Sequence, residues 1–150
     1  MEEYVRLDIS SEDEMASLAE KVAAKAEARD VITLNGNLGA GKTVFCRAFV
    51  RYFLGSDQNV VSPTFTLVQT YPASRFCIWH FDLYRLRNES DLYELGIDDA
   101  FAEGVSLLEW PDLARNFINP DFHTEIKIEI TGDDSRRVDI SGRLGRLLSL

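Results

Sequence analysis

The segment from Gly36 to Thr43 contains residue types that bind phosphate groups, at the spacing that this chemistry requires. It reads GNLGAGKT and matches the pattern G-x-x-x-x-G-K-[ST] at every fixed position. The glycines allow successive backbone N–H groups to turn inward around an anion. Lys42 can reach the β- and γ-phosphates, and the Thr43 hydroxyl can bind Mg²⁺ at a helix N-terminus, whose dipole favours negative charge. The alternative is a glycine-rich turn with a solvent-facing lysine.

The neighbours of this loop favour the phosphate-binding interpretation. A short β-branched run, Val31 to Leu34, precedes the loop, and a helix-compatible segment from Thr43 to Leu54 follows it. Strand, loop and helix therefore occur in the order that a nucleoside triphosphate site requires. The residues expected to hold the nucleotide are Gly36, Asn37, Leu38, Gly39, Ala40, Gly41, Lys42, Thr43 and Val44.

Two carboxylates, Asp82 and Glu109, each follow an apolar run. If both runs are strands parallel to the strand before the loop, both carboxylates emerge at the edge where ligands bind in open α/β sheets. Phosphoryl transfer needs such groups for a metal ion and for the attacking water or acceptor. We therefore predict that both join Lys42 in the catalytic set and Thr43 in the metal-binding set. The sequence leaves open which one touches the metal, and a turn carboxylate paired with Arg85 is the alternative for Asp82.

Two polar features near these carboxylates have simpler interpretations. His80 shares strand parity with Asp82, but a single histidine between Trp79 and Phe81 is more often a hydrogen-bonded structural residue, so it is left out of the catalytic set. The segment from Ser62 to Thr66 could be a nucleotide-sensing loop. Its proline favours a plain turn, which we prefer on the sequence alone.

The elements that must position these residues alternate between helix and strand. A capping box formed by Ser11 and Glu14 starts a predicted amphipathic helix over 12–28. Residues 142–150 match no pattern, so a frayed tail is expected there. The other predicted elements are strands over 31–34, 59–62, 65–71, 76–81 and 105–108, helices over 43–54, 88–96 and 98–102, a helical turn over 112–117, and an antiparallel hairpin of 125–130 with 137–140.

Length and composition indicate one α/β domain. A chain of 150 residues fits one hydrophobic core, so residues 1–150 are predicted to form a single P-loop NTPase-like three-layer domain, with a mixed, largely parallel central sheet and a C-terminal antiparallel hairpin. The formal charge of -9 argues against direct DNA binding by this chain alone. Cys46 and Cys77 lie in apolar runs and are expected to be reduced thiols of a cytoplasmic protein. No apolar stretch approaches the roughly 18 residues of a membrane span.

Five segments occur in the order seen in the bacterial TsaE (YjeE) family, and this resemblance covers nearly the whole chain. It implies a small Mg²⁺-dependent P-loop ATPase needed for threonylcarbamoyladenosine formation at position 37 of tRNAs that read codons beginning with A. It also implies that the chain acts through the TsaB–TsaD heterodimer. The acidic charge of the chain then fits contact with tRNA only through that complex. We expect weak ATP hydrolysis by the isolated chain, because a stabilising group can be supplied in trans. The five segments are Gly36 to Thr43 (GNLGAGKT), Ser62 to Val68 (SPTFTLV), His80 to Arg85 (HFDLYR), Leu95 to Ile97 (LGI) and Leu108 to Pro111 (LEWP).

The resemblance also implies roles for particular residues. Lys42 matches the phosphate contact, Thr43 the Mg²⁺ ligand, and Glu109 the metal and water side of the site. Asp82 matches the aspartate of HFDLYR, and Trp110 matches the tryptophan after the glutamate, for which a core aromatic is an equal alternative. Thr64 and Thr66 match the segment treated as a switch. Contacts with the nucleotide base map to Ser11, Glu12 and either Arg136 or Arg137.

Two other functions share parts of this pattern. A small-molecule P-loop kinase would use the same strand, loop and helix, but it would need an acceptor pocket and a lid, for which Arg85 to Arg87 is the candidate segment. A GTP switch would account for the threonines of the segment from Ser62 to Thr66. Guanine specificity in such proteins usually comes from an Asn-Lys-x-Asp segment, and the sequence contains no Asn-Lys pair, so adenine is favoured.

Overall fold

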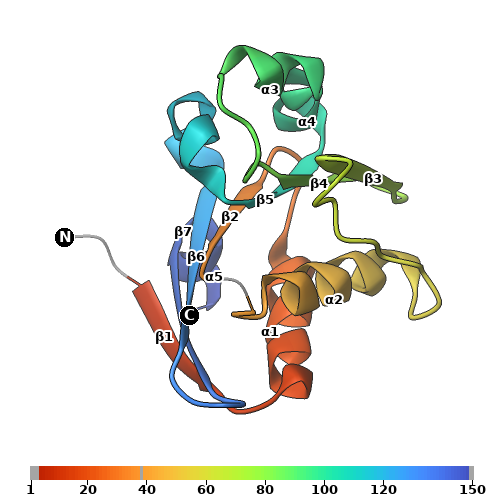
Figure 1. The fold of residues 1–150 in the computed structure, drawn as a ribbon. Helices are drawn as coiled ribbons and strands as arrows, with labels where there is room; N and C mark the ends of the chain where they lie inside the picture. Colours follow the sequence, from red (N-terminus) through yellow and green to blue (C-terminus); the bar gives the residue numbers. More distant parts are fainter. Residues whose placement is uncertain (1–3, 38, 149–150) are drawn as a thin grey trace.

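A computed structural model of the chain describes residues 4–37 and 39–148, which form a seven-stranded sheet with helices on both faces (Figure 1). The strands are β1 (Tyr4–Ile9), β2 (Val31–Asn35), β3 (Val68–Pro72), β4 (Cys77–Asp82), β5 (Val105–Glu109), β6 (His123–Ile130) and β7 (Arg136–Gly142). The helices are α1 (Glu12–Lys25), α2 (Lys42–Leu54), α3 (Ser90–Glu94), α4 (Ile97–Glu103) and α5 (Arg143–Leu148), with 3₁₀ helices η1 (Pro111–Phe117) and η2 (Pro120–Phe122).

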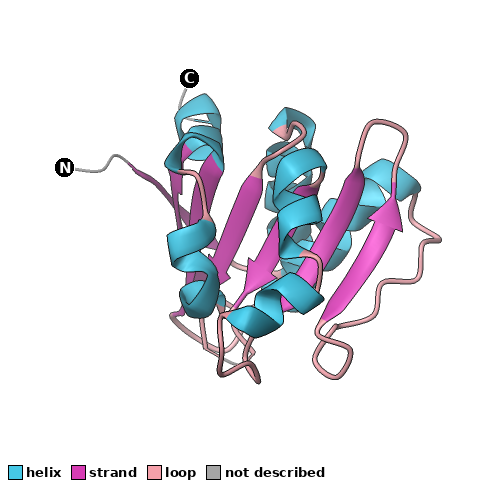
Figure 2. Cartoon of the chain, turned by 90° about the horizontal axis from the view of Figure 1, so that it is seen from above, coloured by secondary structure: helices cyan, strands magenta, loops and turns pink. Residues whose placement is uncertain are grey.

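The sheet is parallel at its centre and antiparallel at its edges. Its strand order is β1-β7-β6-β2-β5-β4-β3. The pairs β2–β6, β2–β5 and β4–β5 are parallel, whereas β1–β7, β6–β7 and β3–β4 are antiparallel. The predicted α/β fold class, with a mixed sheet that is largely parallel at its centre and a hairpin near the C-terminus, is confirmed. Figure 2 shows the strands side by side with helices on either side.

Alternate residues of the central strands supply two hydrophobic cores, because successive side chains of a strand point to opposite faces. On β5, Val105 and Leu107 pack into the core beneath α1 and α2. Leu108 packs into the other core, together with Leu92 of α3 and Ile97 of α4. Since Glu109 follows Leu107 by two residues, it belongs to the face covered by α2. This parity brings the end of β5 towards the loop that precedes α2.

Several predicted element boundaries were wrong. The first helix ends at Lys25 rather than at residue 28. Residues 59–62 are not a strand, because the chain before and after Pro63 runs as a loop and turn and joins the sheet only at Val68. The middle region therefore contributes two strands rather than three. The hairpin and the helical turn near residues 112–117 are present with slightly longer bounds.

The two ends of the described chain are ordered by contacts that the sequence analysis did not anticipate. Strand β1 pairs with β7, and Arg6 forms an ion pair with Asp139. The expected frayed tail is wrong for residues 143–148, which form α5. Arg143 of α5 binds the buried carboxylate of Asp30, and Leu144 is buried in the core. Among the described residues, no helix has both the length and the apolar character to cross a membrane.

Candidate nucleotide site

The loop between β2 and α2 has the backbone conformation of a phosphate-binding turn. Gly39 and Gly41 have φ of 80° and 115°, in the left-handed region that favours glycine. A Cβ at Gly36 would lie 2.8 Å from the carbonyl oxygen of Ile128 on β6, so the start of the loop also requires glycine. Gly41 is the N-cap of α2, and Lys42 is its first residue. The N-terminus of α2 and its dipole therefore face the loop.

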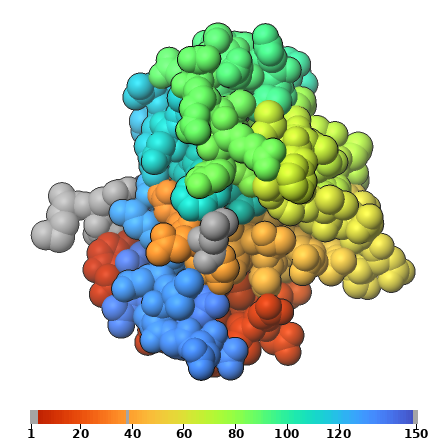
Figure 3. Space-filling model, in the orientation of Figure 1, coloured from red at the N-terminus to blue at the C-terminus, as the bar shows by residue number. Residues whose placement is uncertain are grey.

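This loop forms one wall of a cavity of about 400 Å³. In Figure 3 the orange segment around the loop reaches the surface between green and teal segments above it and the blue β6–β7 hairpin below it. Gly36 and Asn37 are not among the described residues that line the cavity, and Leu38 lies outside the described residues. The other predicted nucleotide-binding residues all line it: Ser11, Glu12, Gly39, Ala40, Gly41, Lys42, Thr43, Val44 and Arg136.

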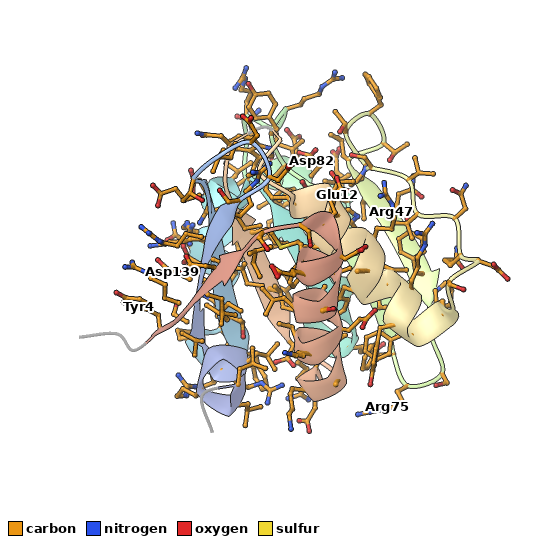
Figure 4. All side chains as sticks on the ribbon, turned by 90° about the horizontal axis from the view of Figure 1, so that it is seen from below. Tyr4, Glu12, Arg47, Arg75, Asp82 and Asp139 are labelled. Carbon is orange, nitrogen blue, oxygen red and sulfur yellow. The ribbon has the colours of Figure 1, made fainter. Side chains whose placement is uncertain are left out.

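Asp82 and Glu109 lie side by side at the carboxyl ends of β4 and β5. The two strands are parallel and the two residues are register partners, while Glu109 also pairs with Leu34 of β2. The expected parallel arrangement of these strands is thus confirmed. Both carboxylates line the cavity and are 6% and 4% exposed. Figure 4 shows Asp82 at the same end of the molecule as Glu12, which lines the cavity from α1.

Lys42 is held by two contacts at the base of the cavity. Its Nζ donates a hydrogen bond of 2.7 Å to the carbonyl oxygen of Gly36 and lies 3.5 Å from the centroid of the Trp110 ring. Burial lowers the pKa of Lys42, and the nearby carboxylates of Glu109 and Asp82 oppose this effect. The ammonium group of Lys42 is therefore partly desolvated at a cavity that Lys42 lines.

Trp110 is part of this site and not only a core aromatic. Its φ of 55° is unusual for a residue with a side chain, and this conformation turns the chain sharply after Glu109. The ring lines the cavity and packs against the Tyr84 ring at a centroid distance of 4.9 Å. The backbone turn thus places an aromatic face under the Lys42 ammonium group, where a cation–π contact is favourable.

The segment from Ser62 to Thr66 forms a turn, as preferred from the sequence, but it also touches the site. The Thr64 hydroxyl donates to Asp82 Oδ2 at 3.4 Å, and the Ser62 and Thr64 hydroxyl oxygens are 2.9 Å apart. The Tyr84 backbone N–H donates to Asp82 Oδ1. The guanidinium of Arg85, considered as a partner for Asp82, lies instead over the Phe65 ring. The turn is therefore coupled directly to a carboxylate of the site.

His80 forms the hydrogen bond expected of a structural histidine, and its partner is Glu109. The distance between His80 Nε2 and Glu109 Oε2 is 2.7 Å, and both side chains are buried. Cys46, His80 and Glu109 each place one potential ligand atom within 4.8 Å of the others, so the three residues form a cluster that could hold a metal ion. Burial raises the pKa of the Cys46 thiol well above its usual range, which disfavours the thiolate that metals bind. We therefore interpret the cluster as a hydrogen-bonded pair beside a neutral thiol.

Arg136 lines the cavity, but its hydrogen bonds go to backbone carbonyls. It donates to Ala40 and Gly39 of the phosphate loop at 2.9 and 3.1 Å and to three carbonyls of its own hairpin turn. Arg137, the other candidate, lies 3.9 Å from Asp8 on the outer strand. Asp133 and Asp134 of the hairpin turn also line the cavity. An aspartate pair between two strands is typical of a turn, so the local sequence gives no signal of their place at the site.

The N-terminus of α1 forms the opposite wall. The Ser11 hydroxyl accepts a hydrogen bond from the Glu14 backbone N–H, as an N-cap does. The Glu14 carboxylate accepts from the Ser10 backbone and hydroxyl rather than from Ser11, so the predicted capping box is displaced by one residue. These hydrogen bonds lower the pKa of Glu14. Capping thus fixes the entry of α1 where Ser11 and Glu12 face the cavity.

Comparison with known proteins places the chain among relatives of similar length. A profile of the family described as threonylcarbamoyl adenosine biosynthesis protein TsaE matches residues 9–138. The chain is 40% identical over 132 residues to a tRNA threonylcarbamoyladenosine biosynthesis protein TsaE of Rickettsia conorii, covering 88% of this chain and 75% of that protein. It is 39% identical over 127 residues to TsaE of Bacillus subtilis, covering 84% and 78%.

A solved structure has the same fold over almost the entire length. The crystal structure of YdiB from Bacillus subtilis matches with a TM-score of 0.79 and 29% identity, covering 99% of this chain and 91% of that chain. The family profile spans most of the sequence, including the phosphate loop and both site carboxylates. On these grounds the chain belongs to the TsaE family of tRNA threonylcarbamoyladenosine biosynthesis proteins.

Proposed function

We propose that this chain binds ATP with Mg²⁺ in the cavity beside the phosphate loop and hydrolyses it during threonylcarbamoyladenosine biosynthesis. The observation that carries the proposal is the meeting of three elements at one cavity. The first turn of α2, directly after the glycine-rich loop, supplies Lys42 and Thr43, and the adjacent ends of β4 and β5 supply Asp82 and Glu109. Glycine-rich backbone, a cation and paired carboxylates are the groups that phosphoryl transfer from a nucleoside triphosphate uses.

The residues present fit the proposed ligands. Backbone N–H groups of the loop and of the first turn of α2 would hold the phosphates, with Lys42 exchanging its contact with the Gly36 carbonyl for phosphate oxygens. The Thr43 hydroxyl and the carboxylates of Asp82 and Glu109 are hard oxygen donors of the type that Mg²⁺ prefers. When bound, Mg²⁺ would neutralise charge on the phosphate oxygens.

The two carboxylates would act on the water that attacks the γ-phosphorus. A new bond forms between this water and phosphorus, the bond to the ADP oxygen breaks, and the water proton passes to a carboxylate or to solvent. Glu109 and Asp82 are both positioned at the cavity for this role, and separate Glu109→Gln and Asp82→Asn variants would distinguish water orientation from metal binding. Lys42 would stabilise negative charge on the transferred group.

We further propose that the chain works with a TsaB–TsaD pair in the cytoplasm, and that tRNA is contacted through that pair. The names of the relatives support a place in this pathway. The net charge of -9 is unfavourable for binding a phosphate backbone directly, so a partner would supply the tRNA contacts. Phe65 and Tyr84, which are 80% and 58% exposed beside the cavity residues Thr64 and Asp82, offer aromatic surface to a protein partner.

The test is ATP hydrolysis by the purified chain, alone and then with the TsaB–TsaD pair and tRNA. We expect weak turnover alone and strong stimulation by the partners, both lost in Lys42→Ala. Lys21→Ala, which changes an exposed lysine of α1, is the matched control and should behave as the wild type. Nucleotide binding without stimulation would contradict the partner-coupled function. ATP consumption only with an added acceptor metabolite would instead support a small-molecule kinase.

A further inference from the structure

We propose that His80 is a positioning residue for Glu109, an inference that rests on the proposed ATPase function. The imidazole Nε2–H donates to Glu109 Oε2 and holds the carboxylate so that Oε1 is the oxygen left for the reaction. Both side chains are almost fully enclosed, at 1% and 5% exposure, and the nitrogen–oxygen distance is 2.7 Å. A hydrogen bond to a charged acceptor at this distance is among the stronger ones in proteins.

The register of the sheet brings the two residues together. His80 of β4 is opposite Leu107 of β5, and Glu109 lies two residues further along the same face. The two side chains therefore make a diagonal contact across parallel strands. Both strands are hydrogen-bonded to neighbouring strands on each side, which fixes the backbone positions of His80 and Glu109. Because His80 is buried within the sheet, the surrounding packing restricts its ring to the position that meets the carboxylate.

Glu109 needs such a partner because of its place in the chain. It is the last residue of β5, and the chain turns away at Trp110 with a φ of 55°. The side chain of a strand-terminal glutamate has three rotatable bonds, and burial of its carboxylate without a hydrogen bond would be costly. The His80 bond compensates for that burial and selects one orientation among the rotamers. Catalysis by a carboxylate depends on this type of preorganisation.

The second nitrogen of the ring supports one definite arrangement. Within the described part of the chain, His80 Nδ1 is buried and has no hydrogen-bond partner. A proton on Nδ1 would leave an unpaired buried donor, whereas a proton on Nε2 is used by Glu109. The geometry therefore points to the Nε2–H tautomer, in which the ring acts as a fixed donor to the carboxylate.

Two amide variants separate positioning from packing. Glutamine places its amide nitrogen near the position of Nε2, whereas asparagine places it near Nδ1, too short to reach Glu109. We expect His80→Gln to keep most of the kcat for ATP hydrolysis and His80→Asn to lose about tenfold or more, as is typical for partners of catalytic ligands. KM and the affinity for ADP should change little in either variant. His123→Gln, which alters the histidine bonded to Thr33, is the control and should keep the wild-type kcat.

Equal kcat in the wild type and in His80→Asn would overturn the inference. An equal loss of kcat in His80→Gln and His80→Asn, together with an equal loss of thermal stability, would also overturn it, because this result is expected of a merely structural role. A wild type that does not hydrolyse ATP, alone or with partners, would instead refute the proposed function.

A spectroscopic measurement tests the hydrogen bond in the wild-type chain, in case the His80 variants fail to fold. The chain has two histidines, so ¹⁵N-histidine labelling gives two sets of ring signals, with His123 as internal reference. We expect the His80 signals to show a protonated Nε2 and an unprotonated Nδ1, and to change in Glu109→Gln while those of His123 do not. Protonation at Nδ1 alone, or His80 signals unaffected by Glu109→Gln, would refute the hydrogen bond on which the inference depends.

Discussion

The Nζ atom of Lys42 lies 3.5 Å from the centroid of the Trp110 ring while it donates to the carbonyl oxygen of Gly36. The lysine of the phosphate loop is thus in contact with the residue that directly follows Glu109. Any anion that draws the ammonium group away changes the charge next to the indole. Binding at the phosphate loop is therefore coupled to the environment of this one tryptophan.

This contact predicts a fluorescence signal for nucleotide binding. Addition of ADP or ATP with Mg²⁺ should change the emission of Trp110 because a cation leaves its ring face. The other tryptophan, Trp79, is partly buried, stacks on Phe81 and does not line the cavity, so its emission should not respond. Titration of the wild type and of Trp110→Phe tests this expectation. A nucleotide-dependent change that persists in Trp110→Phe would contradict it.

Lys42→Ala is expected to weaken nucleotide binding by about tenfold to a hundredfold, the value of a hydrogen bond to a charged group. The fold should be kept, since the contacts that the ammonium group would lose are one hydrogen bond to the Gly36 carbonyl and one contact with the Trp110 ring. Isothermal titration calorimetry with ATP and circular dichroism measure the two effects. Unchanged affinity in a folded Lys42→Ala protein would remove this lysine from the site.

The pH dependence of binding follows from the same residue. Burial lowers the pKa of Lys42 in the free protein, so its positive charge is lost at a lower pH than for an exposed lysine. Nucleotide affinity should therefore decline as the pH rises through this lowered pKa, and the decline should begin below the usual range of lysine. The affinity of Lys42→Ala should lack this step. A step of the same size in the variant would assign the titration to another group.

The part of the site that lies on contiguous motifs was predictable from the sequence, because local chemistry determines it. The spacing of Gly36, Gly41 and Lys42 is typical of a phosphate-binding turn followed by a helix. Asp82 and Glu109 each follow an apolar run, and this position places them at the carboxyl ends of buried strands. Arg136 contacts Ala40, and Asp30 contacts Arg143, so each of these contacts joins residues about a hundred positions apart in the chain. No local pattern indicates such pairs, and for the same reason α5 and β1 were missed.

The ion pair between Asp30 and Arg143 is expected to contribute to stability rather than to nucleotide binding. Asp30 is 1% exposed, and its carboxylate also accepts from the Glu27 backbone N–H. Removing one partner of a buried pair costs about 3–5 kcal/mol, and the 22% exposure of the Arg143 side chain reduces this to roughly 2 kcal/mol. Arg143→Met should thus lower the free energy of unfolding in urea while the affinity for ATP stays the same. A loss of affinity without a loss of stability would contradict this assignment.

Arg136→Ala should weaken nucleotide binding without unfolding the chain. The guanidinium joins the carbonyls of Gly39 and Ala40 to the β6–β7 turn, and these carbonyls must point away from the cavity for the neighbouring N–H groups to point into it. Without this clamp the loop samples other conformations, and ordering it on binding lowers the affinity. We expect a loss of about three- to tenfold in ATP affinity, which corresponds to the net free energy that one hydrogen bond typically contributes.

Arg137→Ala is the matched control for this prediction. It removes the neighbouring guanidinium, which lies 3.9 Å from Asp8 on the far strand and does not line the cavity. Calorimetry at one salt concentration should show weaker ATP binding for Arg136→Ala than for Arg137→Ala. Equal affinities would mean that the loop keeps its shape without Arg136. Because both variants remove one positive charge from the same strand, a difference between them reports on the clamp and not on net charge.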